Sequence, residues 1–349
     1  MKPESFIKKT IAYTAAALLI CALAITIIDP CMHYHAPIGS LEAAETDERL
    51  ATLGSAQHEY YDTVLIGSSM SENFKESWFE DGVFGDTCVK LCMAGSFFTN
   101  YDPLLKAVCS HPEVKNVCFC LDNYLLISDP TDPELHQTTI PEYLYNDDLI
   151  DDAYYIWNKS ILFDHIPKFL TGNITGRTDD AYTWQDIYVF TKDGAKNVYG
   201  AQRIAEIEPE SGAGTFFPNV DALMAALAPY IESRPDITFY FYTPPYSILY
   251  WDDCIRRGQL TAQINAMGYI YEKLLSYDNV RVFFFMDDYD LITDLERYRD
   301  YSHYDQSVNH YMYECMRDGK MELKSEDIFD KLTALQQYAA EYDYEAIFR

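Results

Sequence analysis

Five short, almost uninterrupted apolar runs recur along the chain, and they limit its fold more than any other feature. They are DTVLIGSS (62–69), TCVKLCMAG (87–95), KNVCFCLDNYLL (115–126), ITFYFYTPPY (237–246) and VRVFFFMDD (280–288). A strand with one face in water alternates apolar and polar residues, whereas a parallel strand covered on both faces is apolar throughout. The runs therefore predict about five parallel strands in an α/β domain.

Helical segments are expected between these strands, at 101–112, 222–233 and 258–277. Alternation of strands and helices is typical of a doubly wound sheet, so we expect a three-layer, flavodoxin-like α/β domain over residues 61–320. Residues 127–216 are rich in Asp and Tyr and do not follow this rhythm. They are interpreted as an insertion at the carboxyl edge of the sheet, whose tyrosines offer stacking faces for sugar rings. A terminal helix is predicted over 321–349.

An apolar segment near the N-terminus predicts a membrane anchor. Residues 11–28, IAYTAAALLICALAITII, carry no charge and follow Lys8 and Lys9. A helix of about this length crosses the hydrocarbon core of a bilayer. Lysines mark the cytoplasmic end of a span, so residues 1–10 are expected in the cytoplasm and the domain outside the cell membrane, after a tether at 29–60. A cleaved signal peptide is the alternative interpretation.

The composition excludes some classes of partner and cofactor. The net charge of −29 argues against nucleic acid, whose phosphates require Lys and Arg opposite them. The chain has nine cysteines but no C-x-x-C pair, which argues against a zinc or thioredoxin-like site. Cys88, Cys92, Cys118 and Cys120 lie at even spacing in predicted strands, as buried free thiols do. No metal or organic cofactor is expected.

Two adjacent serines stand where the first predicted strand ends. A strand-to-helix turn needs an N-cap, and serine is a common one, so a purely structural role is one interpretation. The other is that Ser69 is a nucleophile raised above the edge of the sheet, with Ser68 as the cap. A serine nucleophile needs a histidine as base and a carboxylate to orient that histidine.

Asp300 and His303 are the best candidates for these partners. They lie in the sequence RDYSH after the last predicted strand, and the D-x-x-H spacing lets the carboxylate reach Nδ1 of the imidazole. The carboxyl ends of the first and last strands meet at one edge of a doubly wound sheet, so Ser69 and His303 are expected to converge there. The competing interpretation is a helix cap beside a surface histidine.

These residues resemble the sequence blocks of the SGNH (GDSL-like) hydrolase superfamily. More narrowly, the chain is similar to its membrane-anchored bacterial branch, which acts on cell-surface polymers beside membrane O-acyltransferases. The sequence IGSS matches the G-D-S block, with Ser68 in place of the usual Asp and Ser69 as nucleophile. DYSH matches the last block and implies the roles of Asp300 and His303. The resemblance covers about residues 60–316 without the insertion.

Two further blocks of that family carry the oxyanion hole. Gly95, in CMAGSFF, matches the glycine whose backbone N–H is one donor. The G-x-N-D block appears here as CLDN (120–123), without its glycine and with the Asn–Asp order reversed. An ionised Asp122 cannot donate a hydrogen bond to an oxyanion, so Asn123 is the expected side-chain donor.

The resemblance implies a serine esterase or O-acyltransferase that acts outside the cell on an acylated glycan or cell-wall polymer. Its catalytic residues would be Ser69, His303 and Asp300, and a membrane O-acyltransferase is a possible partner. The altered third block leaves an alternative open. The chain would then be a catalytically inactive accessory or binding module for such an acyltransferase or for a surface polymer.

Overall fold

The computed structural model describes residues 3–44, 47–130, 132, 140–146, 148–175, 179 and 182–349. The other residues of the predicted N-terminus (1 and 2), tether (45 and 46) and insertion (131, 133–139, 147, 176–178, 180 and 181) lie outside the described residues. The chain forms two compact units, Met1–Glu59 with Thr139–Ala181, and Tyr60–Thr138 with Tyr182–Arg349. The segment predicted as one insertion is therefore divided between the two units.

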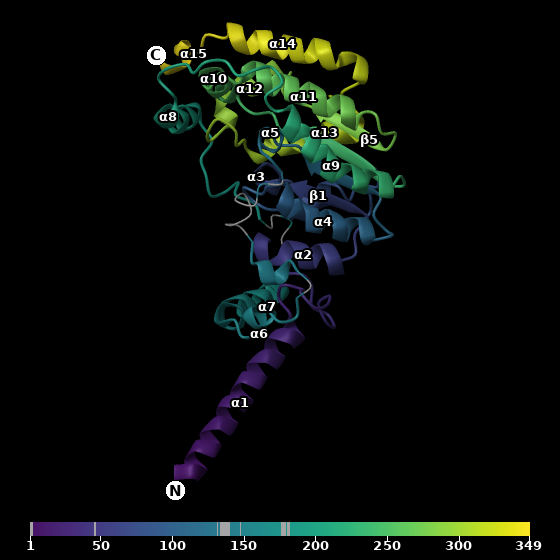
Figure 1. Cartoon of the computed structure of the whole chain (residues 1–349), viewed down its shortest axis with the longest axis vertical. Helices are drawn as coiled ribbons and strands as arrows, with labels where there is room; N and C mark the ends of the chain where they lie inside the picture. Colours follow the sequence, from purple (N-terminus) through teal and green to yellow (C-terminus); the bar gives the residue numbers. More distant parts are fainter. Residues whose placement is uncertain are drawn as a thin grey trace. The chain divides into compact units, whose positions relative to one another are not determined.

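The second unit contains an open sheet of five strands (Figure 1). The strands are β1 (Thr63–Gly67), β2 (Cys88–Cys92), β3 (Asn116–Cys120), β4 (Thr238–Thr243) and β5 (Val280–Phe284). Their order is β2-β1-β3-β4-β5, and every neighbouring pair is parallel. This is the order of flavodoxin-like sheets, and it confirms the prediction of five parallel strands flanked by helices.

Helices connect the strands of this unit and follow the last one. The α-helices are α3 (Ser69–Glu72), α4 (Phe98–Ser110), α5 (Asn123–Ile127), α8 (Lys192–Gln202), α9 (Phe217–Ser233), α10 (Ile248–Arg256), α11 (Leu260–Leu274), α12 (Tyr289–Thr293), α13 (Gln306–Asp318), α14 (Ile328–Glu341) and α15 (Tyr344–Phe348). Short 3₁₀ turns are η1 (Glu76–Trp78), η5 (Leu295–Arg297) and η6 (Ser325–Asp327). The predicted terminal helix thus consists of η6, α14 and α15.

Aromatic side chains on the strands alternate between the two faces of the sheet. On one face, Phe119 of β3 packs edge-on against Tyr101 of α4, with ring centroids 5.4 Å apart. On the other face, Tyr240 of β4 packs against Phe84, which in turn lies against Tyr313 of α13. Both faces are therefore covered, which explains why the strands are apolar throughout.

The strands are shorter than the apolar runs that predicted them. The third run, 115–126, ends as a strand at Cys120, and α5 begins at Asn123. Leu121, Met93, Phe285 and Met286 follow their strands and remain almost completely buried in the connecting loops. An apolar run indicates that a segment is buried, and these segments stay buried beyond the last hydrogen bond to a neighbouring strand.

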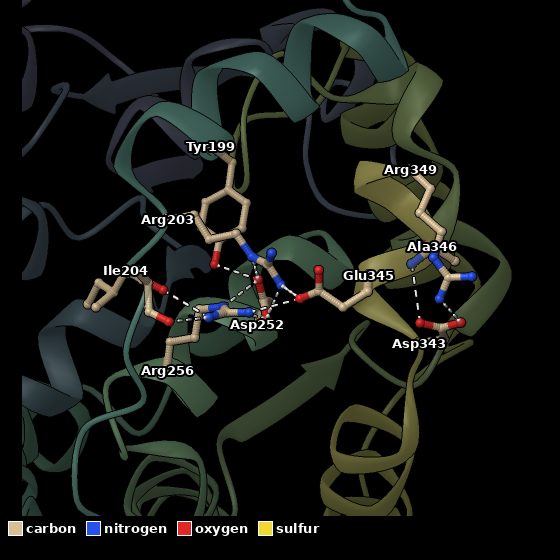
Figure 2. A network of polar contacts seen from close by, with 10 residues as sticks. Tyr199, Arg203, Ile204, Asp252, Arg256, Asp343, Glu345, Ala346 and Arg349 are labelled. Carbon is tan, nitrogen blue, oxygen red and sulfur yellow. Dashed lines mark hydrogen bonds and ion pairs between the residues drawn. The ribbon is translucent and has the colours of Figure 1, made fainter.

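A buried carboxylate joins α8, α10 and α15 (Figure 2). Asp252 of α10 accepts hydrogen bonds from Tyr199 Oη at 2.9 Å and Arg203 Nε at 2.6 Å. It also pairs with Arg256 Nε at 3.1 Å, and both arginines reach Glu345 of α15. Only 3% of the Asp252 side chain is exposed, so its charge depends on these partners.

The first unit contains α1 (Pro3–Ile28), α2 (Glu48–His58), η3 (Glu142–Leu144), α6 (Ala153–Ile156), the π-helical turn η4 (Ile161–His165) and α7 (Ile166–Thr175). Its apolar core contains Ile25, Cys31, Leu144, Tyr155, Ile161 and Ile166. Asp29 ends α1 with φ of 45°, and its carboxylate accepts from the backbone N–H groups of His33, Tyr34 and His35. Among the described residues, α1 is the one helix long and apolar enough to cross a membrane.

Candidate active site

Ser69 stands at the point where β1 turns into α3. Gly67 ends the strand, and a Cβ there would lie 2.1 Å from Ser71 Oγ and 2.6 Å from Cys120 Cβ, so the turn requires glycine. The Ser68 hydroxyl accepts from Met70 N at 3.2 Å and is the N-cap of α3, as predicted. Ser69 is then the first helical residue.

A continuous chain of hydrogen bonds links Ser69, His303 and Asp300. Ser69 Oγ lies 2.9 Å from His303 Nε2, although the two residues are 234 positions apart. His303 Nδ1 lies 2.9 Å from Asp300 Oδ2. With the proton on Nδ1 directed at the carboxylate, Nε2 is left to accept the serine proton. The structure brings all three predicted catalytic residues together at the carboxyl edge of the sheet.

The local sequence explains the geometry of Asp300 and His303. Asp300 Oδ1 accepts from the backbone N–H groups of Ser302 at 2.9 Å and His303 at 2.8 Å, which forms an Asx turn. Burial by itself would raise the pKa of Asp300. The hydrogen bonds and charge of His303, with the two backbone donors, outweigh burial and lower that pKa to about 2. Asp300 is therefore ionised at neutral pH.

Two residues that the sequence did not single out support the triad. Trp184 Nε1 donates to the backbone carbonyl of Ser69 at 3.0 Å, and its ring meets the imidazole of His303 edge-on with centroids 5.4 Å apart. Arg299 Nε lies 3.1 Å from Asp300 Oδ2. Arg299 directly precedes Asp300 in the sequence, so its contact with that carboxylate could have been predicted. No local sequence pattern indicates a role for Trp184.

The start of α13 is tied to the first turn after Ser69. Tyr304 Oη and Asn309 Nδ2 both donate to the backbone carbonyl of Met70, at 3.2 Å and 2.9 Å. Both side chains are completely buried. The segment that carries His303 is therefore held to the segment that carries Ser69 by bonds outside the triad.

A cavity of about 500 Å³ opens beside the triad and is lined by Ser69, His303, Gly95, Asp122, Tyr246, Tyr250 and Tyr301, among others. Tyr246 and Tyr250 stack with ring centroids 4.6 Å apart, and Tyr250 and Tyr301 lie nearly parallel at 6.1 Å. These stacking tyrosines come from the β4–α10 connection, from α10 and from the loop before His303. The insertion was expected to supply such rings, and the residue it brings to the triad is Trp184.

The two predicted oxyanion residues are placed differently. Gly95 lines the cavity, and its φ of +66° is a left-handed conformation that favours glycine. A Cβ at Gly95 would meet nothing within 4 Å. Asn123 is buried, its Nδ2 donates to Tyr250 Oη at 3.2 Å, and it does not line the cavity.

Asp122 occupies the cavity wall in place of Asn123. Its carboxyl is fully buried and accepts from Tyr246 Oη at 2.6 Å and from Cys120 Sγ at 3.4 Å. Burial raises the pKa of Asp122, and hydrogen bonds from Tyr246 and Ser68 partly offset that rise. In the third sequence block, CLDN (120–123), the side chain that faces the cavity is thus the buried carboxyl of Asp122.

Among the described residues, no group of three or more His, Cys, Asp or Glu side chains is arranged to hold a metal ion. All nine cysteines are free. No protein-family model matches the chain, and a search of curated proteins also finds no match. The chemistry of the site therefore has to be argued from its geometry.

Proposed function

We propose that this protein is a membrane-anchored, extracytoplasmic serine esterase or O-acyltransferase of the SGNH (GDSL-like) type. The observation that carries the proposal is the hydrogen-bond chain from Ser69 through His303 to Asp300. A serine, a histidine and a buried carboxylate in this order form the usual arrangement for covalent acyl transfer. The adjoining cavity gives an ester group access to Ser69.

The reaction follows from the positions of these groups. His303 Nε2 accepts the Ser69 proton as Oγ attacks the ester carbonyl, and the Asp300 carboxylate stabilises the imidazolium. The backbone N–H groups of Ser69 and Gly95 would hold the negative charge on the carbonyl oxygen. His303 then gives its proton to the leaving alcohol. Water, or a hydroxyl of a second polymer, takes the acyl group from Ser69.

The anchor and the cavity support a proposal for the substrate class. Helix α1 would fix the second unit, which contains the sheet and is called the sheet unit below, at the outer surface of the cell membrane, with Lys8 and Lys9 on the cytoplasmic side. Stacked tyrosines beside a nucleophile suit the flat faces of sugar rings. An acylated cell-surface glycan or polymer is therefore the proposed substrate, and a membrane O-acyltransferase is a proposed partner.

A specific observation favours a second candidate function. The third block offers the buried Asp122 carboxyl to the cavity, while the amide of Asn123 is bonded to Tyr250. An ionised carboxylate would repel a developing oxyanion. On this alternative the domain binds an acylated polymer or a membrane O-acyltransferase without catalysing transfer.

Labelling with a fluorophosphonate probe separates the two functions, because the probe reacts only with an activated serine. The esterase proposal expects labelling of the wild-type chain, loss of labelling in Ser69→Ala and retention in Ser68→Ala. Hydrolysis of p-nitrophenyl acetate should follow the same pattern, with Ser69→Ala reduced on the order of 10⁶-fold in kcat. A folded wild-type protein that takes no label would support the accessory function.

A further inference from the structure

The stretch from residue 149 to 174 exposes an unusual number of large apolar side chains. Leu149, Ile150, Tyr154, Trp157, Phe163 and Ile174 are 57% to 85% exposed. Most of these residues lie on or next to α6, η4 and α7 of the first unit. Large exposed apolar patches usually mark a contact with a partner or a membrane.

The exposed side chains of η4 and α7 fall into two stripes. Phe163, Pro167, Leu170 and Ile174 are exposed and are spaced four, three and four residues apart, so they follow one face of the helix. Ser160, Asp164, Lys168 and Thr171, also exposed, form a polar stripe beside it. The buried face, which includes Ile161, Ile166 and Phe169, packs inward. A helix with an apolar and a polar exposed stripe is suited to a membrane interface.

The position of α6 along α1 shows how deep this segment would lie. Trp157 Nε1 donates to the backbone carbonyl of Leu18 at 3.4 Å, and Ile25 belongs to the same apolar core as Tyr155 and Ile161. Leu18 precedes the end of α1 at Ile28 by ten residues, which is about 15 Å of helix. The hydrocarbon core is about 30 Å thick, so Trp157 would reach roughly its middle.

The span cannot be shifted to avoid this contact. The charge-free C-terminal part of α1 is residues 10–28, about 28 Å long, and a shift toward the N-terminus would bring Lys8 and Lys9 into the hydrocarbon. If α1 crosses the bilayer, the side chains packed against its C-terminal half are therefore below the membrane surface with it.

We propose that residues 149–174 are embedded in the outer leaflet of the membrane, where the apolar face of α6, η4 and α7 contacts lipid acyl chains beside α1. The inference rests on the anchoring part of the proposed function. Exposed apolar side chains of α1, among them Leu19, Leu23 and Ile27, belong to the same compact unit.

Fluorescence quenching by brominated lipids tests the contact directly. The full chain is reconstituted into vesicles of phosphatidylcholine and phosphatidylglycerol, with bromine on the phosphatidylcholine acyl chains. We expect brominated lipid to quench the tryptophan emission of the wild-type chain. We expect more than half of this quenching to be lost in Trp157→Phe. Trp251 is completely buried in the sheet unit and should contribute no quenching.

A matched pair of substitutions gives the test a gain of signal as well. In the Trp157→Phe background, Phe163→Trp places a tryptophan on the proposed lipid-facing stripe, and Phe329→Trp places one on α14 of the sheet unit. Both phenylalanines are exposed, at 66% and 77%. Phe163→Trp should restore quenching by brominated lipid, whereas Phe329→Trp should be quenched by aqueous acrylamide instead.

Flotation of the vesicles separates failure of this inference from failure of the anchor. Suppose that the chain floats with the vesicles but that acrylamide, and not brominated lipid, quenches the emission of Trp157 and of the tryptophan introduced by Phe163→Trp. The anchor then stands and the inference is overturned. If the chain does not float, the anchor and the inference are both overturned. Labelling of Ser69 by fluorophosphonate reports separately on the proposed enzymatic activity in the same samples.

Discussion

Asp300 contributes to stability as well as to orientation of the imidazole. Its pKa is lowered from an ordinary value of 3.8 to about 2, and a depressed carboxyl pKa means that the folded state favours the ionised form. The shift corresponds to roughly 2 kcal/mol of stability. This stability is present above pH 4 and is lost as the pH falls from about 4 toward 2.

Asp300→Asn should therefore be less stable than the wild type by roughly 2 kcal/mol at pH 7, with the difference shrinking as the pH falls to 2. Tryptophan fluorescence of the full chain in detergent, followed through guanidinium titrations at several pH values, measures that difference. A difference that stays constant between pH 7 and pH 2 would contradict the assigned pKa.

The proposed catalytic roles of Ser69, His303 and Asp300 predict non-additive losses. Ser69→Ala and His303→Ala should each reduce kcat for p-nitrophenyl acetate on the order of 10⁶-fold, and the double variant should be little worse than either. Asp300→Ala should lose less, about 10⁴-fold, because the serine and base remain. Independent, multiplicative losses from Ser69 and His303 would show that the two residues do not act as one unit.

At the scale of elements, the buried Asp252 carboxylate and its two arginines link α8, α10 and α15 of the sheet unit. The side chains of Arg203 and Arg256 are only 14% and 12% exposed. In Asp252→Ala, these arginines would keep only the exposed Glu345 and backbone carbonyls as partners. Removing one member of a buried ionic cluster costs about 3–5 kcal/mol. Thermal and guanidinium unfolding should both show this loss.

The neighbouring residue provides a matched control for that prediction. Asp253 pairs with Arg257 at 2.7 Å, but 44% of the arginine side chain is exposed. Surface pairs contribute little, so Asp253→Ala should cost less than about 1 kcal/mol. Equal losses in the two variants would mean that Asp252 is not the centre of the network in Figure 2.

For the whole molecule, the anchor predicts both topology and extraction. Protease added outside intact cells should digest the sheet unit, and detergent should be needed to release the uncut chain, because the proposed anchor α1 would be held in the hydrocarbon by its apolar side chains. Immunoblots of fractionated cells measure both properties. A soluble form that begins near residue 30 would instead indicate a cleaved signal peptide.

Segments whose structure depends mainly on their own residues were predicted well. Apolar runs located all five strands, because a strand buried on both faces must be apolar along its whole length. The D-x-x-H spacing predicted the bond between Asp300 and His303, because an Asx turn is local. Ser68 as the cap of α3 is local in the same way.

Contacts between residues far apart in the chain were decided only by the tertiary structure. Trp184 bonds to Ser69 across 115 positions, and nothing near either residue encodes that pairing. Which member of the Asp122–Asn123 pair faces the cavity depends on where Tyr246 and Tyr250 lie. The association of Thr139–Ala181 with α1 likewise follows from a shared apolar core, which a sequence pattern cannot assign to one neighbour over another.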